Sequence, residues 1–446
     1  MEEKKVSKKC SKYYLYILIT GLLFLLKSSI LDLSELCLNI PKNIFGVEVV
    51  IKNHILMKLF LEYSGYIIYG GISLILVRKK IFIENDDKTK LLSGNTKFYI
   101  QKNSKTFRTL LIACCFFGIQ LIVRNILSFF SIWMLDIFVF NIIFINYFML
   151  YFLNTPIYKH QLYALIFNFS ISLILLISAS AIKYEGVSDF DNVNTIYGSY
   201  SYILLFYVIY MILSALLSLS QVLQKKLMDF NFISPFTILF VIGLINSLFI
   251  FIAILITTNE SCGENLTKNN TCPISYQGYK NGDSFFDNFY IYISNMSDRL
   301  KNDKTSFYIE IFLVYPLYSL AWFLKNYYET LIVLYLNPNF VLLSDNIYYS
   351  TRKILLIISI PTDIRTYLRL FGEVVLIIGY LLYLEIFELK CFGLNKNTKK
   401  KITERGLREN ILIDINLIDE DDEDHSQNRR GGRTEMINLE GYTFIV

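Results

Sequence analysis

The sequence predicts an all-α membrane protein in which ten transmembrane helices form two inverted repeats of five helices. Three observations favour this fold. Ten separate stretches of the 446 residues are apolar and reach the roughly 20 residues that one bilayer crossing needs. The loops between these stretches alternate in charge, and one hydrophilic loop carries four Asn-X-Ser/Thr sequons with two cysteines among them.

A strongly basic loop separates the second predicted helix from the third. The segment 78–108 holds nine basic residues against three acidic ones, and the positive-inside rule therefore predicts that it lies in the cytosol. Pro41 lies in the short loop after the first helix, and Pro156 follows the fourth helix. We expect these helices at residues 13–33, 55–77, 109–129 and 132–152.

The next three helices are expected at residues 162–182, 199–222 and 233–256. An acidic loop with Glu185, Asp189 and Asp191 follows the fifth helix, and a basic turn at residues 224–229 follows the sixth. The first of these loops is therefore predicted outside and the second in the cytosol.

The hydrophilic loop 257–305 follows the seventh helix and is predicted to lie on the lumenal or outer side. There its sequons are candidate glycosylation sites, at Asn259, Asn265, Asn269 and Asn295. A chance occurrence of sequons in an Asn-rich loop is the alternative. Cys262 and Cys272 share this loop, so we predict a disulfide between them if the compartment is oxidising.

The last part of the membrane domain allows two divisions. One ends a helix at Leu324 and leaves the apolar stretch 354–360 unassigned. The other breaks the chain at Asn337-Pro338-Asn339, which is a strong helix stop. We favour the second division, with helices at residues 315–336 and 340–360, followed by a tenth at residues 369–387.

Ten crossings divide the chain into three parts and place both termini in the cytosol. These are an N-terminal tail at residues 1–12, a membrane domain at 13–389, and a mostly disordered C-terminal tail at 390–446 with acidic and basic blocks. Five helices are an odd number, so a second copy of five inserts upside down, as in many transporters. Thr155-Pro156 and Ile360-Pro361 end the fourth and ninth helices in a similar way and give a faint trace of such a repeat.

Charged and amide side chains inside the predicted helices are the candidate solute-binding groups, because such groups in a bilayer usually face the bundle interior. Arg352 and Lys353 lie past the middle of the ninth helix without an acidic residue inside one turn. Fixed positive charge there favours an anionic solute. The complete predicted set is Arg352, Lys353, Lys27, Asn346 and Asn326; for each residue the alternative is a purely structural role, such as snorkelling by Lys27.

Several function classes lack support in the sequence. The three histidines have no metal-ligand spacing, and the chain contains no Cys-X-X-Cys, phosphate-binding glycine loop or Gly-X-Ser-X-Gly motif. We therefore expect no enzyme activity, no metal or other cofactor and no nucleic-acid partner.

Three stretches resemble the drug/metabolite transporter superfamily, in particular its nucleotide-sugar-transporter-like (EamA-like) solute carriers. They are residues 148–161, residues 217–236, and the segment from Leu334 through Arg352-Lys353 to Gly372 and Gly379. Members of the phosphate-translocator branch carry a Lys/Arg pair in helix nine that contacts substrate phosphate, and Arg352-Lys353 is similar in type and place. The chain departs from the pattern at Lys225, where an acidic residue is common, and in the length of its sequon loop.

The resemblance implies a secondary transporter that moves a small organic solute, such as an anionic metabolite or a nucleotide sugar, by alternating access without ATP. The expected partners are membrane lipid and this solute, with a homodimer as a further option. The expected location is an endomembrane (Golgi, ER or vacuole) or the plasma membrane. The alternative is a non-transporting membrane scaffold or receptor, for which the long outer loop and the charged tail are the motivation.

Overall fold

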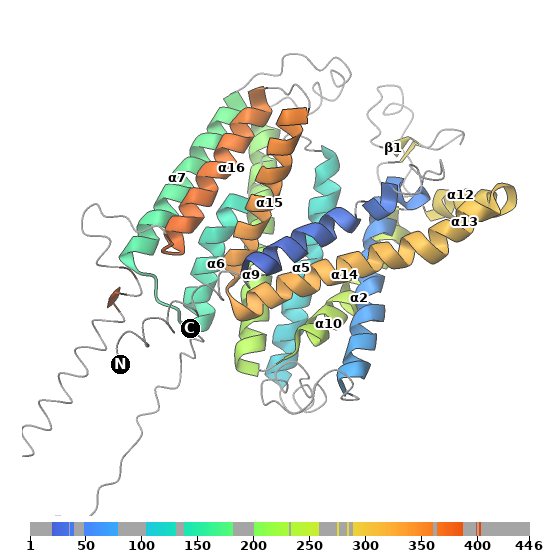
Figure 1. Cartoon of the computed structure of the whole chain (residues 1–446), viewed down its shortest axis with the longest axis horizontal. Helices are drawn as coiled ribbons and strands as arrows, with labels where there is room; N and C mark the ends of the chain where they lie inside the picture. Colours follow the sequence, from blue (N-terminus) through green and yellow to red (C-terminus); the bar gives the residue numbers. More distant parts are fainter. Residues whose placement is uncertain are drawn as a thin grey trace, which may run out of the picture. The chain divides into compact units, whose positions relative to one another are not determined.

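The computed structural model consists almost entirely of helices (Figure 1). The structure describes residues 20–34, 36–39, 49–78, 104–130, 138–181, 200–231, 233–257, 274–275, 283–284, 289–359, 364–386, 398 and 401–402. Within these ranges the strands are limited to β1 (Ile274–Ser275) and β2 (Asp283–Ser284), which pair antiparallel.

Helices occupy each of the apolar stretches that the sequence marks. Residues 20–34 and 36–39 are helical, and a 3-10 turn, η1, covers Val50–Asn53. The longer helices are α2 (Ile55–Arg78), α5 (Ser104–Phe130), α6 (Phe138–Leu153), α7 (Lys159–Ala181), α9 (Tyr200–Asn231), α10 (Pro235–Thr257), α14 (Tyr315–Tyr335), α15 (Pro338–Ser359) and α16 (Ile364–Tyr383). Before α14 come α12 (Phe289–Asn302), α13 (Lys304–Ile309) and η2, a π-helical segment at Glu310–Val314.

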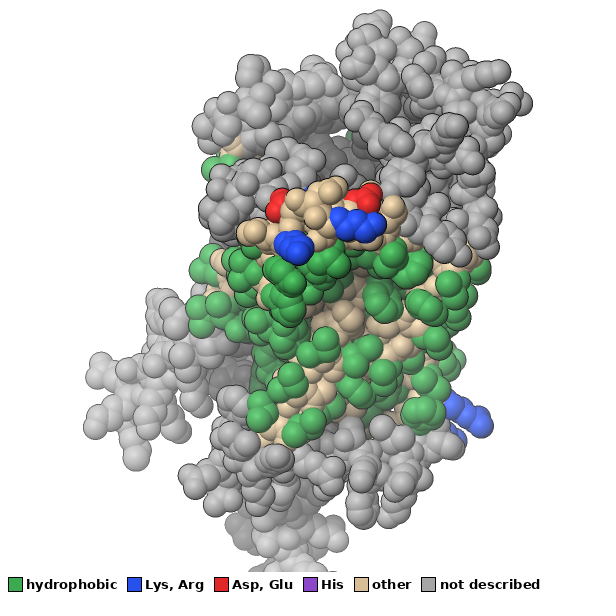
Figure 2. Space-filling model, turned by 90° about the vertical axis from the view of Figure 1, so that its right-hand side faces the viewer, with side chains coloured by type: hydrophobic (Ala, Val, Ile, Leu, Met, Phe, Trp, Pro, Cys, Tyr) green, Lys and Arg blue, Asp and Glu red, His purple; other side chains and the backbone are tan. Residues whose placement is uncertain are grey.

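Five helical segments are long and apolar enough to cross a bilayer, which identifies an integral, multi-pass membrane protein. They are Leu56–Leu76, Lys105–Val123, Val208–Asn231, Pro235–Ile256 and Lys304–Tyr335. Hydrophobic side chains cover the middle of the face in Figure 2, and Lys, Arg, Asp and Glu side chains gather at its edges. That arrangement matches an apolar bilayer core with polar boundaries.

The structure confirms one predicted helix boundary and corrects two others. α14 ends at Tyr335 and α15 begins at Pro338, so the break at Asn337-Pro338 is confirmed. The basic turn predicted at residues 224–229 is wrong, because α9 continues as a helix to Asn231. The predicted loop 257–305 also contains a helix, α12, and the short strand pair.

The extension of α9 has a visible physical cause. Lys225 donates a hydrogen bond to the Leu334 carbonyl oxygen at 2.8 Å, and its ammonium nitrogen lies 3.2 Å from the Asp229 carboxylate one turn later. Asp229 is therefore satisfied by a neighbour at i,i+4 spacing. The charged residues that suggested a turn instead lie along a continuing helix.

Two compact units can be distinguished in the chain. One comprises Met1–Leu22, Ile157–Phe167 and Ile378–Val446, and the other comprises Leu23–Pro156 and Asn168–Ile377. The second unit holds the residues of the hydrophobic core cluster, which α2, α5, α9, α10 and α14 supply in large part. The contacts described below lie within this second unit.

Antiparallel packing relates α2 to α10 and α5 to α9. The Phe60 and Phe251 rings are 6.4 Å apart, and Gly70, further along α2, faces Phe240, earlier in α10. In the other pair, Asn231 of α9 donates to Thr106 at 3.0 Å, and Ser220 donates to the Ala113 carbonyl at 2.8 Å. Residue numbers rise along one helix as they fall along its partner.

Parallel packing relates α6 to α9, and the helix at residues 20–34 to α15. Ser218 donates to the Asn141 carbonyl at 3.3 Å, and further along both helices the Lys226 ammonium lies 5.5 Å from the centre of the Phe152 ring. In the second pair, Lys27 contacts Asp345, and Tyr348 donates to Asp32 at 2.6 Å. Numbers rise together in both pairs.

Glycines allow α2 to lie unusually close to two neighbouring helices. A Cβ atom added to Gly65 would lie 2.7 Å from the Ser319 carbonyl oxygen of α14, and one added to Gly243 of α10 would lie 3.0 Å from the Tyr63 carbonyl oxygen. Small residues at membrane-helix interfaces permit this kind of approach between backbones. Both seams border the polar interior described next.

Candidate functional site

Four charged side chains from three helices form the central feature of the second unit, called the charge cluster below. They are Lys27, Lys325, Glu329 and Asp345. Two are cations and two are anions, so the cluster is neutral overall. Burial of an isolated charge in a membrane protein interior costs much free energy, whereas burial of a charge with its counter-charge costs much less.

Lys27 joins the first described helix to α15. Its ammonium group donates to an Asp345 carboxylate oxygen at 2.7 Å and to the Ser344 hydroxyl at 3.0 Å. The Lys27 side chain is 3% exposed and that of Asp345 is 30% exposed. Lys27 is therefore a buried ion-pair partner, and the alternative of snorkelling to the membrane surface does not apply in this structure.

Lys325 and Glu329 form the second pair of the charge cluster. They lie one turn apart on α14 with 2.8 Å between the ammonium nitrogen and the carboxylate oxygen. Lys27 is within electrostatic range of Glu329, and Asp345 is within range of Lys325. The two ion pairs therefore influence one another, and a change at one alters the field at the other.

A small cavity adjoins the charge cluster between α5, α9, α10 and α14, with room for about one water molecule. Its polar lining consists of Gln221, Gln224, Asn326, Glu329 and Thr330. The Gln221 Oε1 atom is buried and has no hydrogen-bond partner among the described residues. An unsatisfied buried acceptor beside a cavity is a natural place for water or for a polar group of a solute.

A second line of polar contacts joins α14 to α2. The Asn326 amide donates to the Tyr66 hydroxyl and to the Trp322 carbonyl, the latter at 2.9 Å. Two turns earlier on α14, the Tyr318 hydroxyl donates to the Glu62 carboxylate. Glu62 is only 5% exposed, so α2 contributes a further buried acidic group, which contacts the same helix, α14, that lines the cavity.

The residues predicted to bind solute separate into two groups. Lys27 and Asn326 belong to the buried polar interior, and Asn346 is half-buried on α15 next to Asp345. Arg352 lies two turns further along α15 with its side chain 45% exposed, 3.8 Å from the Asp32 carboxylate and over the Tyr348 ring at 5.5 Å. The side chain of Lys353 lies outside the described residues.

Sequence reasoning missed most of the cavity lining. Gln221 lies at the end of the predicted sixth helix, and Gln224 lies in the turn predicted after it. Their one-turn spacing, together with Ser220, was the available signal, because it gives a polar stripe on a helix that is otherwise apolar. Asp32 was also missed, since only the folded chain shows that it faces Arg352.

The remaining sequence-based sites lie mostly beyond what the structure describes. Asn259, Asn265, Asn269, Cys262 and Cys272 fall outside the described residues. Asn295 lies on α12 and is half-buried. The predicted disulfide and all four glycosylation sites, Asn295 included, stay predictions.

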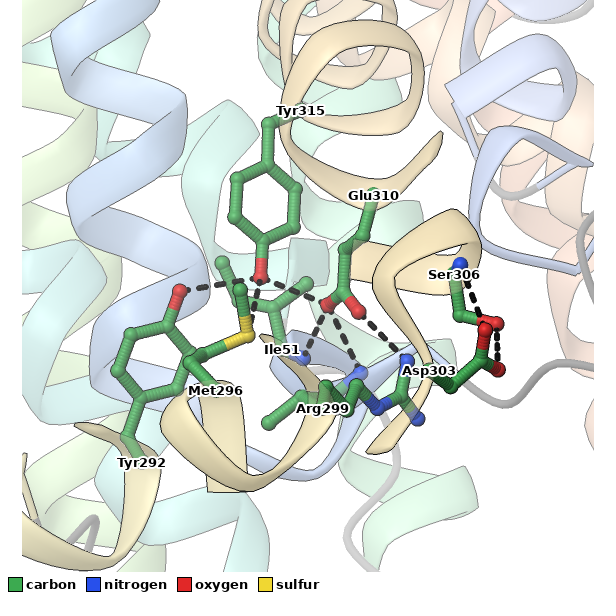
Figure 3. Close-up of polar contacts among 9 residues, drawn as sticks. Ile51, Tyr292, Met296, Arg299, Asp303, Ser306, Glu310 and Tyr315 are labelled. Atoms are coloured by element: carbon green, nitrogen blue, oxygen red, sulfur yellow. Dashed lines mark hydrogen bonds and ion pairs between the residues drawn. The ribbon is translucent and has the colours of Figure 1, made fainter. Parts of the chain in front are cut away.

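A separate polar cluster around Glu310 holds α12 against the start of the long α13–η2–α14 segment (Figure 3). The Glu310 carboxylate, in a residue that is 1% exposed, accepts hydrogen bonds from the Tyr315 hydroxyl at 2.7 Å and from the Val50 amide at 2.8 Å. Its other oxygen pairs with Arg299 of α12 at 2.7 Å. Every oxygen of this buried carboxylate is satisfied, so the cluster has the character of a structural anchor.

Comparison with known proteins adds no family assignment. No protein-family model matches the sequence, and a search of curated proteins also gives no match.

Proposed function

We propose that this protein is a secondary transporter of the drug/metabolite transporter type, which moves a small organic solute through a central site by alternating access. The observation that carries the proposal is the charge cluster. Lys27, Lys325, Glu329 and Asp345 come together among apolar helices beside a cavity with an unsatisfied acceptor. Ionisable groups inside a membrane bundle commonly mark a solute or ion pathway.

The directions of the packed helices support ten alternating crossings. If the helix at residues 20–34 is the first, then α2, α5, α6, α9, α10 and α15 are the second, third, fourth, sixth, seventh and ninth. Alternation requires the second and seventh, and the third and sixth, to be antiparallel. It also requires the fourth and sixth, and the first and ninth, to be parallel. All four relations agree with the contacts above.

The identity of the contacting pairs supports an inverted repeat. In such a repeat, a twofold axis exchanges each helix with the helix five places away. The contact between the third and seventh helices is then repeated between the eighth and second. The contact between the fourth and sixth is repeated between the ninth and first. α5 packs on α10 as α14 packs on α2, and α6 packs on α9 as α15 contacts the first described helix. The pairs that such an axis maps onto themselves, α2 with α10 and α6 with α15, are also in contact.

The balanced charges of the cluster bear on the class of solute. A neutral cluster gives no strong preference for an anion at the cavity, whereas further along α15 the two adjacent cationic residues Arg352 and Lys353 stand against the single carboxylate of Asp32. We therefore place an anionic group of the solute, such as a phosphate or carboxylate, near Arg352 and Lys353, and its polar remainder near Asn326 and the cavity.

Uptake and exchange in proteoliposomes test the proposal. Purified protein is reconstituted and offered panels of anionic, cationic and neutral solutes, and the Lys27→Met variant is compared with Lys301→Met, which removes an exposed lysine of α12. We expect transport of at least one solute, loss of transport in Lys27→Met, and normal transport in Lys301→Met. An Arg352→Gln/Lys353→Gln variant then tests the anion preference.

Two results would count against the proposal. Failure of all three panels with a folded protein would refute transport. Cellular function that survives Lys27→Met but is lost when the Glu310 anchor of α12 is broken would favour the alternative, a membrane scaffold or receptor that acts through its outer segment. The observation behind this alternative is the ion pair between Arg299 and Glu310, which attaches α12 to the start of the long helical segment.

A further inference from the structure

Glu62 differs from the acidic groups described above because it has no ion-pair partner among the described residues. Glu329 pairs with Lys325, Asp345 pairs with Lys27, and Glu310 pairs with Arg299. The Glu62 carboxylate, by contrast, accepts one hydrogen bond from the Tyr318 hydroxyl. It lies in the second turn of α2, inside the candidate membrane span Leu56–Leu76.

The charged and titratable groups that face Glu62 come from two elements. On its own helix, Lys58 lies one turn earlier with its ammonium nitrogen 5.7 Å from the centre of the Tyr318 ring, and Tyr63 and Tyr66 follow Glu62. On α14 the groups are Tyr318 and Lys325, and Lys325 is already paired with Glu329. α10, which packs along α2, contributes no ionisable side chain because its sequence contains none.

Two opposing effects act on the charge of Glu62. Burial opposes a charge on the carboxylate, whereas the positive charges of Lys58 and Lys325 favour it. The Tyr318 hydroxyl is compatible with both forms, because a carboxylic acid still offers an oxygen acceptor. Glu62 is therefore a group that can exchange a proton while its hydrogen-bond partner stays in place.

Glu62 is also connected to the central site. Tyr66 lies one turn further along α2 and accepts a hydrogen bond from Asn326, which lines the cavity with Glu329. The two contacts of α2 with α14, at Glu62 and at Tyr66, flank the close approach of Gly65 to Ser319. A change in the charge of Glu62 thus acts on the helix seam that borders the cavity.

We propose that Glu62 is a proton-binding site that couples solute movement to a proton gradient, which deepens and rests on the transport function proposed above. In each cycle the Glu62 carboxylate takes one proton from water on one side of the membrane and becomes the acid. It releases that proton to water on the other side after the conformational change. No electrons are transferred and no other bond changes.

Infrared spectroscopy of the purified protein tests proton binding without any solute. A pH titration from about 5 to about 9, which includes the pKa of about 8–9 documented for buried glutamates, follows the carbonyl band of protonated carboxylic acids. We expect a band that is lost as the pH rises, that is missing in Glu62→Gln, and that remains in Asp298→Asn, a control at an exposed position on α12. Identical titrations of the wild type and Glu62→Gln would overturn the assignment.

Transport in proteoliposomes tests the coupling. With a solute that passes the uptake panel, a pH difference of one unit supports about tenfold accumulation for one coupled proton. Glu62→Gln should reduce the accumulation ratio to about one while solute exchange without a gradient continues. Gradient-driven accumulation by Glu62→Gln would overturn the coupling. If none of the tested solutes is transported, the proposed transport function and its coupling to protons are both refuted. The infrared titration still decides whether Glu62 binds a proton.

Discussion

Replacement of Gly243 by alanine tests the close seam between α10 and α2. The added Cβ would lie 2.9 Å from the Tyr66 Cβ and 3.0 Å from both the Ile67 nitrogen and the Tyr63 carbonyl oxygen. Two of these three atoms belong to the α2 backbone, so the helix itself has to move. Overpacking costs about 1–3 kcal/mol, and we take the upper end, about 3 kcal/mol, because backbone atoms cannot rotate away.

Alanine also gains about 1 kcal/mol over glycine in a helix interior, so the net cost of Gly243→Ala is about 2 kcal/mol. Gly70→Ala is the matched control at the same seam, because its Cβ would meet only Phe240 atoms at 3.5 Å. That contact is ordinary, so Gly70→Ala should be unchanged or more stable by up to about 1 kcal/mol.

Thermal unfolding in detergent, followed by tryptophan fluorescence at one fixed scan rate, measures the difference. Membrane proteins often unfold irreversibly, so apparent midpoints are compared only at that rate. A difference of about 2–3 kcal/mol between the two variants corresponds to an apparent Tm lower by about 4 °C or more in Gly243→Ala. Equal midpoints for the two variants would refute the close packing of α10 on α2.

Three further predictions concern single polar groups. Glu310→Ala should leave Arg299 without its partner at 2.7 Å, cost about 3–5 kcal/mol, and speed amide hydrogen exchange throughout α12; unchanged exchange in α12 would contradict the anchor role of Glu310. Burial lowers the pKa of His54 from 6.5 to about 4, so the folded state holds the neutral ring. The resulting stability is present above pH 6.5 and is lost as the pH falls from there towards 4. His54→Phe should flatten this part of the pH profile of the unfolding free energy, measured by denaturation, and an unaltered slope would count against this role of His54. Lys27→Met should lower the free energy of unfolding by less than the loss of about 3–5 kcal/mol that follows when a fully buried ion pair is broken, because the Asp345 side chain keeps 30% exposure. A double-mutant cycle with Asp345→Leu should give a favourable coupling energy. Additive effects of the two substitutions would show that the pair contributes nothing to stability.

The helical framework was predictable because each apolar stretch has the length of a bilayer crossing and the breaks carry strong chemical signals. Asn337-Pro338 ended one helix and began the next as expected, since proline cannot donate the backbone hydrogen bond that a continuing helix needs. The prediction of a turn at residues 224–229 was wrong for the opposite reason. Its charged residues are compatible with a helix, and the contact of Lys225 with the Leu334 carbonyl, which extends that helix, joins residues 109 positions apart.

The candidate site was predictable in its members more than in its arrangement. Lys27 and Asn326 were identifiable as polar groups inside apolar helices, and the structure does bring them to the interior. Their partners were not, because the separation of Lys27 from Asp345 in the chain is 318 residues. Arg352 met the sequence criterion of having no acidic neighbour within a turn, yet Asp32 from another helix lies beside it.

The π-helical segment at Glu310–Val314 gives the long helix a means of rotation. One π turn contains an additional residue compared with an α turn, and its first residue, Glu310, accepts a hydrogen bond from Tyr315 and pairs with Arg299. Tightening that turn into α-helical geometry would twist every later side chain of α14 by about 100° and shift it by about 1.5 Å along the axis. Lys325, Asn326 and Glu329 would then turn together towards new neighbours, so the π turn at Glu310–Val314 sets the direction in which the polar face of α14 points.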